Sequence, residues 1–108
     1  MASPAAPHPG GADPIHVDSG HYTVEIENEK IRVLRIRYGP HEKSHMHAHP
    51  EMVGVMVTDA HIRFTYPDGR SEEINGHAGQ VLHFPAHEHL PENLSDQPFQ
   101  AIAIELKG

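Results

Sequence analysis

The sequence predicts an all-β domain, a sandwich or barrel built from seven or eight short strands. Apolar and polar residues alternate in short runs, as in half-buried strands. Turn signals separate these runs every 8–12 residues, and no segment keeps a helical period. A chain of 108 residues has the length of one domain.

The N-terminal 14 residues differ from the rest in composition. They are rich in Ala, Pro and Gly and show no periodicity, which predicts a flexible arm over residues 1–14. The β-barrel domain is then expected over residues 15–108.

The strands are expected where alternation is bounded by turn residues. In the second of them, Leu34, Ile36 and Tyr38 alternate with arginines, which indicates one wet face. Pro67-Asp68-Gly69 and Asn75-Gly76 are strong turn signals, and a polar loop is expected over residues 91–98. The predicted strands are 22–26, 34–38, 53–57, 61–66, 71–74, 80–84 and 99–106.

Composition excludes several classes of function. The formal charge is −7, from 15 acidic and 8 basic residues, which argues against a nucleic-acid partner. No run of 18 apolar residues is present, so no membrane span is expected. The N-terminus lacks the basic region and apolar core of a signal peptide, and we expect a cytoplasmic protein. With no Cys, any metal must be held by nitrogen and oxygen.

Residues 41–57 are the most unusual stretch, with four of the 12 histidines in nine residues before an apolar run. If a strand extends back over them, alternate side chains share one face and lie roughly 6–7 Å apart. Two such imidazoles can share an ion at about 2.0–2.1 Å. A single His-x-His pair is also compatible with a solvated patch. The face in question would carry His45, His47, His49, Glu51 and Val53.

A second group of histidines follows about 40 residues later. His83 lies in a predicted strand, and His87 and His89 follow Pro85, which ends that strand. His89 alone would be an ordinary surface residue. Because metal sites in β-barrels commonly combine a close pair with a lone ligand from another strand, the two groups together predict one metal centre.

These two segments resemble the motifs of the cupin superfamily. The second motif, Gly-x5-Pro-x-Gly-x2-His-x3-Asn, is matched in role by Gly79, Pro85, His89 and Asn93, with His87 in place of the middle Gly and one residue fewer before His89. The resemblance spans about residues 31–106. It implies a single-domain jelly-roll β-barrel, usually dimeric, that holds a divalent metal.

The first motif, Gly-x5-His-x-His-x3/4-Glu-x6-Gly, fits in two registers. One starts at Gly39; the other starts at His41 and puts Val53 where Glu belongs. The second places the tight turn at Ala60, as the motif asks, and is favoured. It gives the metal ligands His47, His49 and His89, with Glu51 and His45 as the alternatives of the first register.

Three-histidine sites occur in cupin-like iron dioxygenases that cleave small diketones or thiols. The resemblance therefore implies a mononuclear non-haem metalloenzyme with dioxygenase-like chemistry on a small oxygen-rich substrate. Fe(II) or Mn(II) is favoured, with Ni, Zn or Cu as alternatives, since three imidazoles leave positions open. His83 and His87 are candidate catalytic residues, as a general base or as donors near the metal.

Two other functions fit the same motifs: a non-catalytic metal- or ligand-binding cupin, acting as a sensor or accessory protein, and an isomerase that needs only a Lewis acid. The partner expected in each case is a small molecule. A homodimer is also expected, because sheet edges need cover. Residues 15–26, with Tyr22, Val24 and Ile26, are the expected contact.

Overall fold

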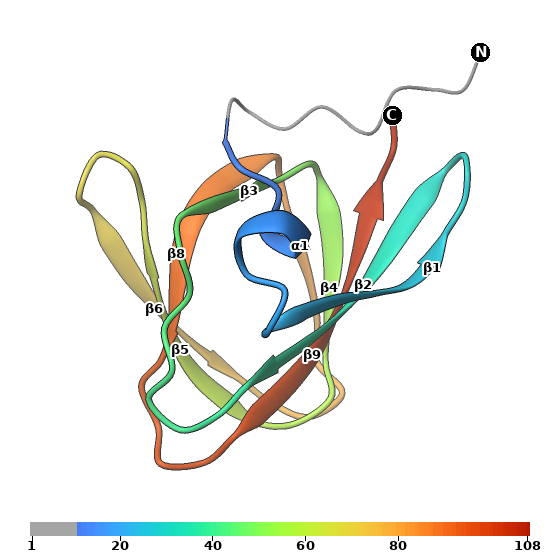
Figure 1. The fold of residues 1–108 in the computed structure, drawn as a ribbon. Helices are drawn as coiled ribbons and strands as arrows, with labels where there is room; N and C mark the ends of the chain where they lie inside the picture. The colour runs from blue at the N-terminus through green and yellow to red at the C-terminus, as the bar shows by residue number, and fades with distance from the viewer. Residues whose placement is uncertain (1–10) are drawn as a thin grey trace.

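The computed structural model describes residues 11–108, which form two facing antiparallel sheets and one short helix (Figure 1). The sheets have the strand orders β1-β2-β9-β4-β7 and β3-β8-β5-β6. The elements are α1 (Pro14–Val17), β1 (Tyr22–Glu27), β2 (Ile31–Tyr38), β3 (His47–His49), β4 (Met52–Met56), β5 (Ala60–Thr65), β6 (Ser71–Gly76), β7 (Val81–Phe84), β8 (His87–Asn93) and β9 (Phe99–Leu106). The predicted all-β class is confirmed as a jelly-roll β-sandwich.

The core lies between the sheets and follows the predicted alternation in β2. Leu34 and Tyr38 are buried, whereas Arg37 is exposed. The last strand, β9, is central and pairs with both β2 and β4. Its small buried residues, Ala101 and Ala103, line a cavity between the sheets. The buried hydrophobic residues are Tyr22, Leu34, Tyr38, Met52, Met56, Ile62, Phe64, Phe99, Ala101 and Ala103.

The extended strand over the histidines is not continuous. The chain forms β3 at His47–His49, breaks at Pro50 and Glu51, and continues as β4 in the other sheet. Pro50 has no N–H to offer a ladder, so it marks the crossing between sheets. The expected single face from His45 to Val53 is therefore confirmed only for His47 and His49, because His45 is exposed before β3 begins and the chain leaves the sheet after His49.

The polar loop expected over residues 91–98 is wrong for its first three residues. They belong to β8, which lies between β3 and β5. Its buried positions are His89, Pro91 and Asn93. Polar residues and a proline on the inner face concealed the alternation that identifies a strand from its apolar residues.

Residues 11–17 pack against the barrel, and α1 lies beside the β3 and β1 strands (Figure 1). The side chain of Asp13 caps α1 by accepting from the N–H of Ile15. The N–H of Ala48 in β3 donates to the carbonyl of Ala12 at 2.8 Å. Of the predicted arm, residues 1–10 lie outside the described residues, whereas residues 11–14 cover the free edge of β3.

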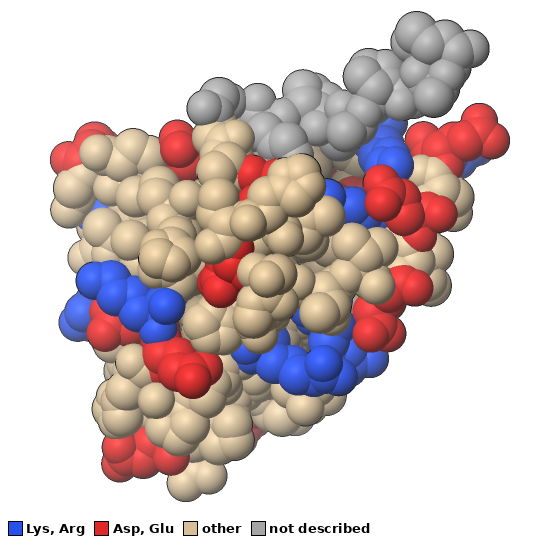
Figure 2. Space-filling view, viewed as in Figure 1, with Lys and Arg blue, Asp and Glu red and all other residues tan. Residues whose placement is uncertain are grey.

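Charged side chains are distributed in small groups of both signs on the face shown in Figure 2. Lys and Arg side chains lie next to Asp and Glu side chains on this face. Among residues 11–108, no helix has the length and apolar character needed to cross a membrane.

Candidate metal centre

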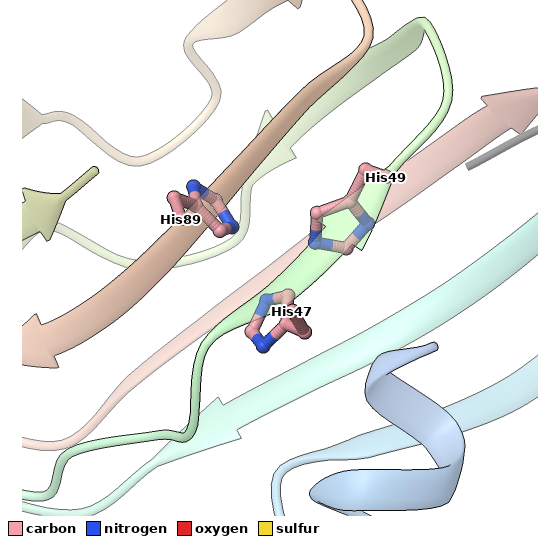
Figure 3. A group of neighbouring side chains, drawn as sticks. All are labelled: His47, His49 and His89. Carbon is pink, nitrogen blue, oxygen red and sulfur yellow. The ribbon is translucent and has the colours of Figure 1, made fainter. Parts of the chain in front are cut away.

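Three imidazoles converge on the inner face of β3 and β8. His47 and His49 come from β3, and His89 lies directly opposite His47 on β8 (Figure 3). Each offers one nitrogen, and these three nitrogens all lie within 4.8 Å of one another. All three side chains are buried. The two-residue period of β3 and its register with β8 thus assemble the set.

The outer nitrogens of the two β3 histidines are fixed by hydrogen bonds. Nδ1 of His47 lies 2.8 Å from the carbonyl oxygen of His45, and because a carbonyl only accepts, Nδ1 is the donor. Nδ1 of His49 lies 2.7 Å from Oε2 of Glu105, which accepts in the same way. Both rings therefore present Nε2, with its lone pair, to the cluster.

Glu105 is itself held in a chain of ion pairs. Nε of Arg32 donates to Oε1 of Glu105 at 2.7 Å, and the other guanidinium nitrogens donate to both oxygens of Asp13. Burial alone would raise the pKa of Glu105, but the bonds from His49 and Arg32 hold it below its ordinary value. Glu105 is thus a buried carboxylate that orients His49.

The inner nitrogens have no partner among the described residues. Nε2 of His47 and both ring nitrogens of His89 are buried without a hydrogen bond. Burial, with His49 close by, lowers the pKa of His47 to about 3, and burial lowers that of His89 well below its ordinary value. Neutral imidazoles with bare lone pairs are what a divalent ion requires, so these residues fit a metal.

A small cavity lies beside the cluster. Its volume is about 60 Å³, and its wall includes His49 and His89. Tyr22 and Tyr38 also line it, and their hydroxyls share a hydrogen bond of 2.7 Å. The other lining residues are apolar, and Met52, Met56, Phe64 and Phe99 are among them. The cluster thus borders a space with few polar groups.

The residues of the alternative register lie apart from the cluster. His45 and Glu51 are exposed, and Oε2 of Glu51 lies 2.7 Å from Nε2 of His83. Val53, expected at the motif's Glu position, pairs with His83 and Ile104 on the outer side of its sheet. Gly54, the next residue, lines the cavity instead. No carboxylate therefore replaces the motif's Glu on the inner face of β4.

The two candidate catalytic histidines differ in position. His83 is exposed on β7 with Glu51, and the structure does not bring it to the cluster. His87 begins β8 opposite His49, and its ring centroid is 4.4 Å from that of His89. Of the two, only His87 lies beside the three imidazoles.

Glu105, Arg32 and Tyr22 were not singled out from the sequence as parts of the site. In β9, Glu105 has the parity of Ala101 and Ala103, which are buried. An acidic residue in phase with small core residues is a signal of a buried functional carboxylate. The more apolar set of Ile102, Ile104 and Leu106, which does share one face as expected, lies on the outer side and masked that signal.

No protein-family model matches the chain, and no curated protein matches it. Among solved structures, a cupin domain from Bordetella pertussis is 27% identical, with a TM-score of 0.75, over 96% of this chain and 100% of that one. A double-stranded β-helix protein from Klebsiella pneumoniae is 17% identical, with a TM-score of 0.65, over 96% of this chain and 84% of that one.

A third similar structure is an enzyme, the oxalate decarboxylase of Bacillus subtilis, which has Mn(II) centres. It is 23% identical, with a TM-score of 0.59, over 79% of this chain and 26% of that one. The three-histidine cluster supports metal binding by this chain. A β-sandwich that matches a cupin domain over almost its whole length makes the chain a small cupin-type protein.

Proposed function

We propose that the protein is a mononuclear non-haem metalloenzyme whose ion is held by His47, His49 and His89. The observation that carries this proposal is the set of three converging imidazoles, two of which, His47 and His89, have buried nitrogens without a hydrogen-bond partner among the described residues. Native proteins rarely leave buried polar atoms unpaired, and each exception asks for an explanation. A divalent ion would take one nitrogen from each of the three rings.

The proposed ion is Fe(II) or Mn(II). When bound, it would supply Lewis acidity and open positions for a small anionic substrate and dioxygen. Neutral histidines leave the ion its full +2 charge, which favours an enolate or thiolate. Glu105 holds the ring of His49 by its 2.7 Å bond, and the carbonyl of His45 does the same for His47.

The cavity limits the size of the substrate. Its volume of about 60 Å³ is well below the roughly 150 Å³ of a cavity that holds benzene. Its apolar wall excludes water from the space next to the imidazoles. We therefore favour a substrate smaller than benzene, such as a small aliphatic thiol, over an aromatic or sugar substrate.

The test begins with metal content and ends with oxygen uptake. Untagged protein reconstituted with Fe(II) without oxygen should hold one ion per chain and, once oxygen is admitted, should consume dioxygen with a small aliphatic thiol. His47→Gln and His89→Gln should lose the ion, because two imidazoles hold it far more weakly than three. His61→Gln is the matched control, since that exposed histidine pairs with Glu73. Wild-type protein without stoichiometric metal would refute the centre.

A non-catalytic role as a metal or ligand sensor is the second candidate. The small cavity favours it, because little space is left for a substrate beside the cluster. Metal-loaded protein that consumes no oxygen with diketones, thiols or phenols would favour this role over the dioxygenase. Turnover of a substrate without oxygen consumption would favour a Lewis-acid isomerase.

We also propose a homodimer. Tyr22, part of the contact expected from the sequence, is buried inside the barrel, so only Val24 and Ile26 of that set remain exposed. An apolar row supports the proposal on the outer side of the larger sheet: Ile26 pairs with Val33, Val33 with Ile104, and Ile104 with Val53. Light scattering at tens of micromolar should give twice 12.0 kDa. A monomeric mass would refute it.

A further inference from the structure

A fourth histidine completes the arrangement on β3 and β8. The register places His47 opposite His89 and His49 opposite His87. Because side chains two residues apart share a face, the four imidazoles form two neighbouring cross-strand pairs on the inner side. The residues between them, Ala48 and Glu88, face outward, where Gly11 lies.

The hydrogen bonding of His87 repeats that of His47. Nδ1 of His87 lies 2.7 Å from the carbonyl of Pro85, two residues earlier, as Nδ1 of His47 lies 2.8 Å from the carbonyl of His45. Nδ1 is therefore the donor in both rings. Nε2 of His87 then carries a lone pair, and it is buried without a hydrogen-bond partner among residues 11–108.

The ring separations suit a shared ion. Imidazoles bound at about 2.0–2.1 Å place their centroids about 4.5 Å apart at right angles and about 5.2 Å apart at a tetrahedral angle. The centroid of His87 is 4.4 Å from that of His89 and 5.5 Å from that of His49. Its nitrogen lies outside the three that fall within 4.8 Å of one another, so its half-buried ring must turn before it can bind the same ion.

We propose that His87 is a fourth imidazole ligand, so that the centre is a four-histidine site. The inference rests on the proposed metal centre and adds to it. No side-chain carboxylate takes the remaining place, since Glu105 bonds the outer nitrogen of His49 and Glu51 bonds His83. An octahedral ion with four imidazoles keeps two open positions. They suit one chelating anion, or dioxygen beside a substrate that binds through a single atom.

The experiment counts nitrogens, because affinity alone does not separate a ligand from a residue that orients one. Loss of such an orienting residue also weakens metal binding by about 10–100-fold. Untagged protein with one equivalent of Cu(II) is measured by pulsed EPR, which counts imidazoles from the modulation of their remote nitrogens. We expect four in the wild type, three in His87→Gln and four in His83→Gln. His47→Gln should show fewer than four, which ties the signal to this site.

Three outcomes overturn an assignment. Three imidazoles in both the wild type and His87→Gln would refute His87 as a ligand and leave the three-histidine centre intact. Four imidazoles in His87→Gln would also refute it. Wild-type protein that binds Cu(II) identically to His47→Gln would refute the metal centre itself and His87 with it. Equal thermal melts of the wild type and His87→Gln in chelator establish that the variant is folded.

Discussion

Two clusters of polar side chains lie side by side in this barrel, and they differ in whether their buried atoms have hydrogen-bond partners. The chain Asp13–Arg32–Glu105 makes hydrogen bonds with good geometry at every link and reaches His49. The histidine cluster next to it leaves buried ring nitrogens without partners. A buried ionic network that serves structure satisfies its own atoms, whereas a binding site keeps lone pairs for its ligand. This difference in hydrogen bonding distinguishes the structural network from the adjacent metal-binding cluster.

The largest loss of stability should come from a change in the Asp13–Arg32–Glu105 network. Glu105→Ala leaves the guanidinium of Arg32 buried with one partner fewer, and removing one member of a buried pair costs about 3–5 kcal/mol. We expect that loss in the free energy of unfolding, measured by urea denaturation in chelator. Glu73→Ala, at an exposed pair with His61, is the control and should cost less than about 1 kcal/mol. Equal losses of unfolding free energy in Glu105→Ala and Glu73→Ala would show that the buried network contributes no more to stability than an exposed ion pair.

Acidification should destabilise the folded protein through the buried histidine cluster. The pKa of His47 is about 3 and that of His89 is well below normal, whereas both titrate near 6.5 in the unfolded chain. Between these values the unfolded chain binds more protons, so stability is full above about pH 6.5 and falls as pH drops. Metal-free protein should lose about 2 kcal/mol through His47 between pH 7.5 and 5, and His89 should add to that loss.

The measurement is a set of thermal melts from pH 5 to 8, with metal and with chelator. Because protons compete with the ion for the imidazoles, the two curves should be far apart at pH 7.5 and converge near pH 5. Curves with a constant separation would show that histidine does not hold the metal.

A smaller effect of opposite sign is expected at His89. His89→Leu removes two buried nitrogens that have no partner and places an aliphatic side chain beside Phe64. We expect metal binding to be lost while the metal-free protein becomes more stable by about 1–3 kcal/mol, the cost of an unsatisfied buried group. Calorimetry in chelator measures it. If metal-free His89→Leu were less stable than the metal-free wild type, His89 would have a structural role like that of Glu105.

The smallest effect should be at Glu51. Its carboxylate lies outside the cluster and pairs with exposed His83, a type of pair worth about 0–1 kcal/mol. Glu51→Gln should therefore keep its full metal content and almost all of its stability. A Glu51→Gln protein without metal would instead favour the motif register that starts at Gly39, in which Glu51 is a ligand.

The sequence predicted the strands with apolar alternation and the grouping of His47, His49 and His89. It did so because their spacing follows the two-residue period of a strand. β8 was missed because its inner positions carry His, Pro and Asn. Glu105 was missed because its partners are distant in the chain: Arg32 is 73 residues away and His49 is 56 residues away. Such pairing depends on strand order, which local periodicity does not contain.

The central place of β9 in the larger sheet has a consequence for biosynthesis. β2 and β4 do not pair with each other, and they join one sheet only when β9 inserts between them. Both pairings of β9 connect residues that are far apart in the chain. Folds dominated by such distant pairings close slowly, typically in milliseconds to seconds. Since Glu105 arrives on that strand, His49 gains its orienting partner only when β9 has been made. We therefore expect metal to be loaded after translation, into a finished barrel.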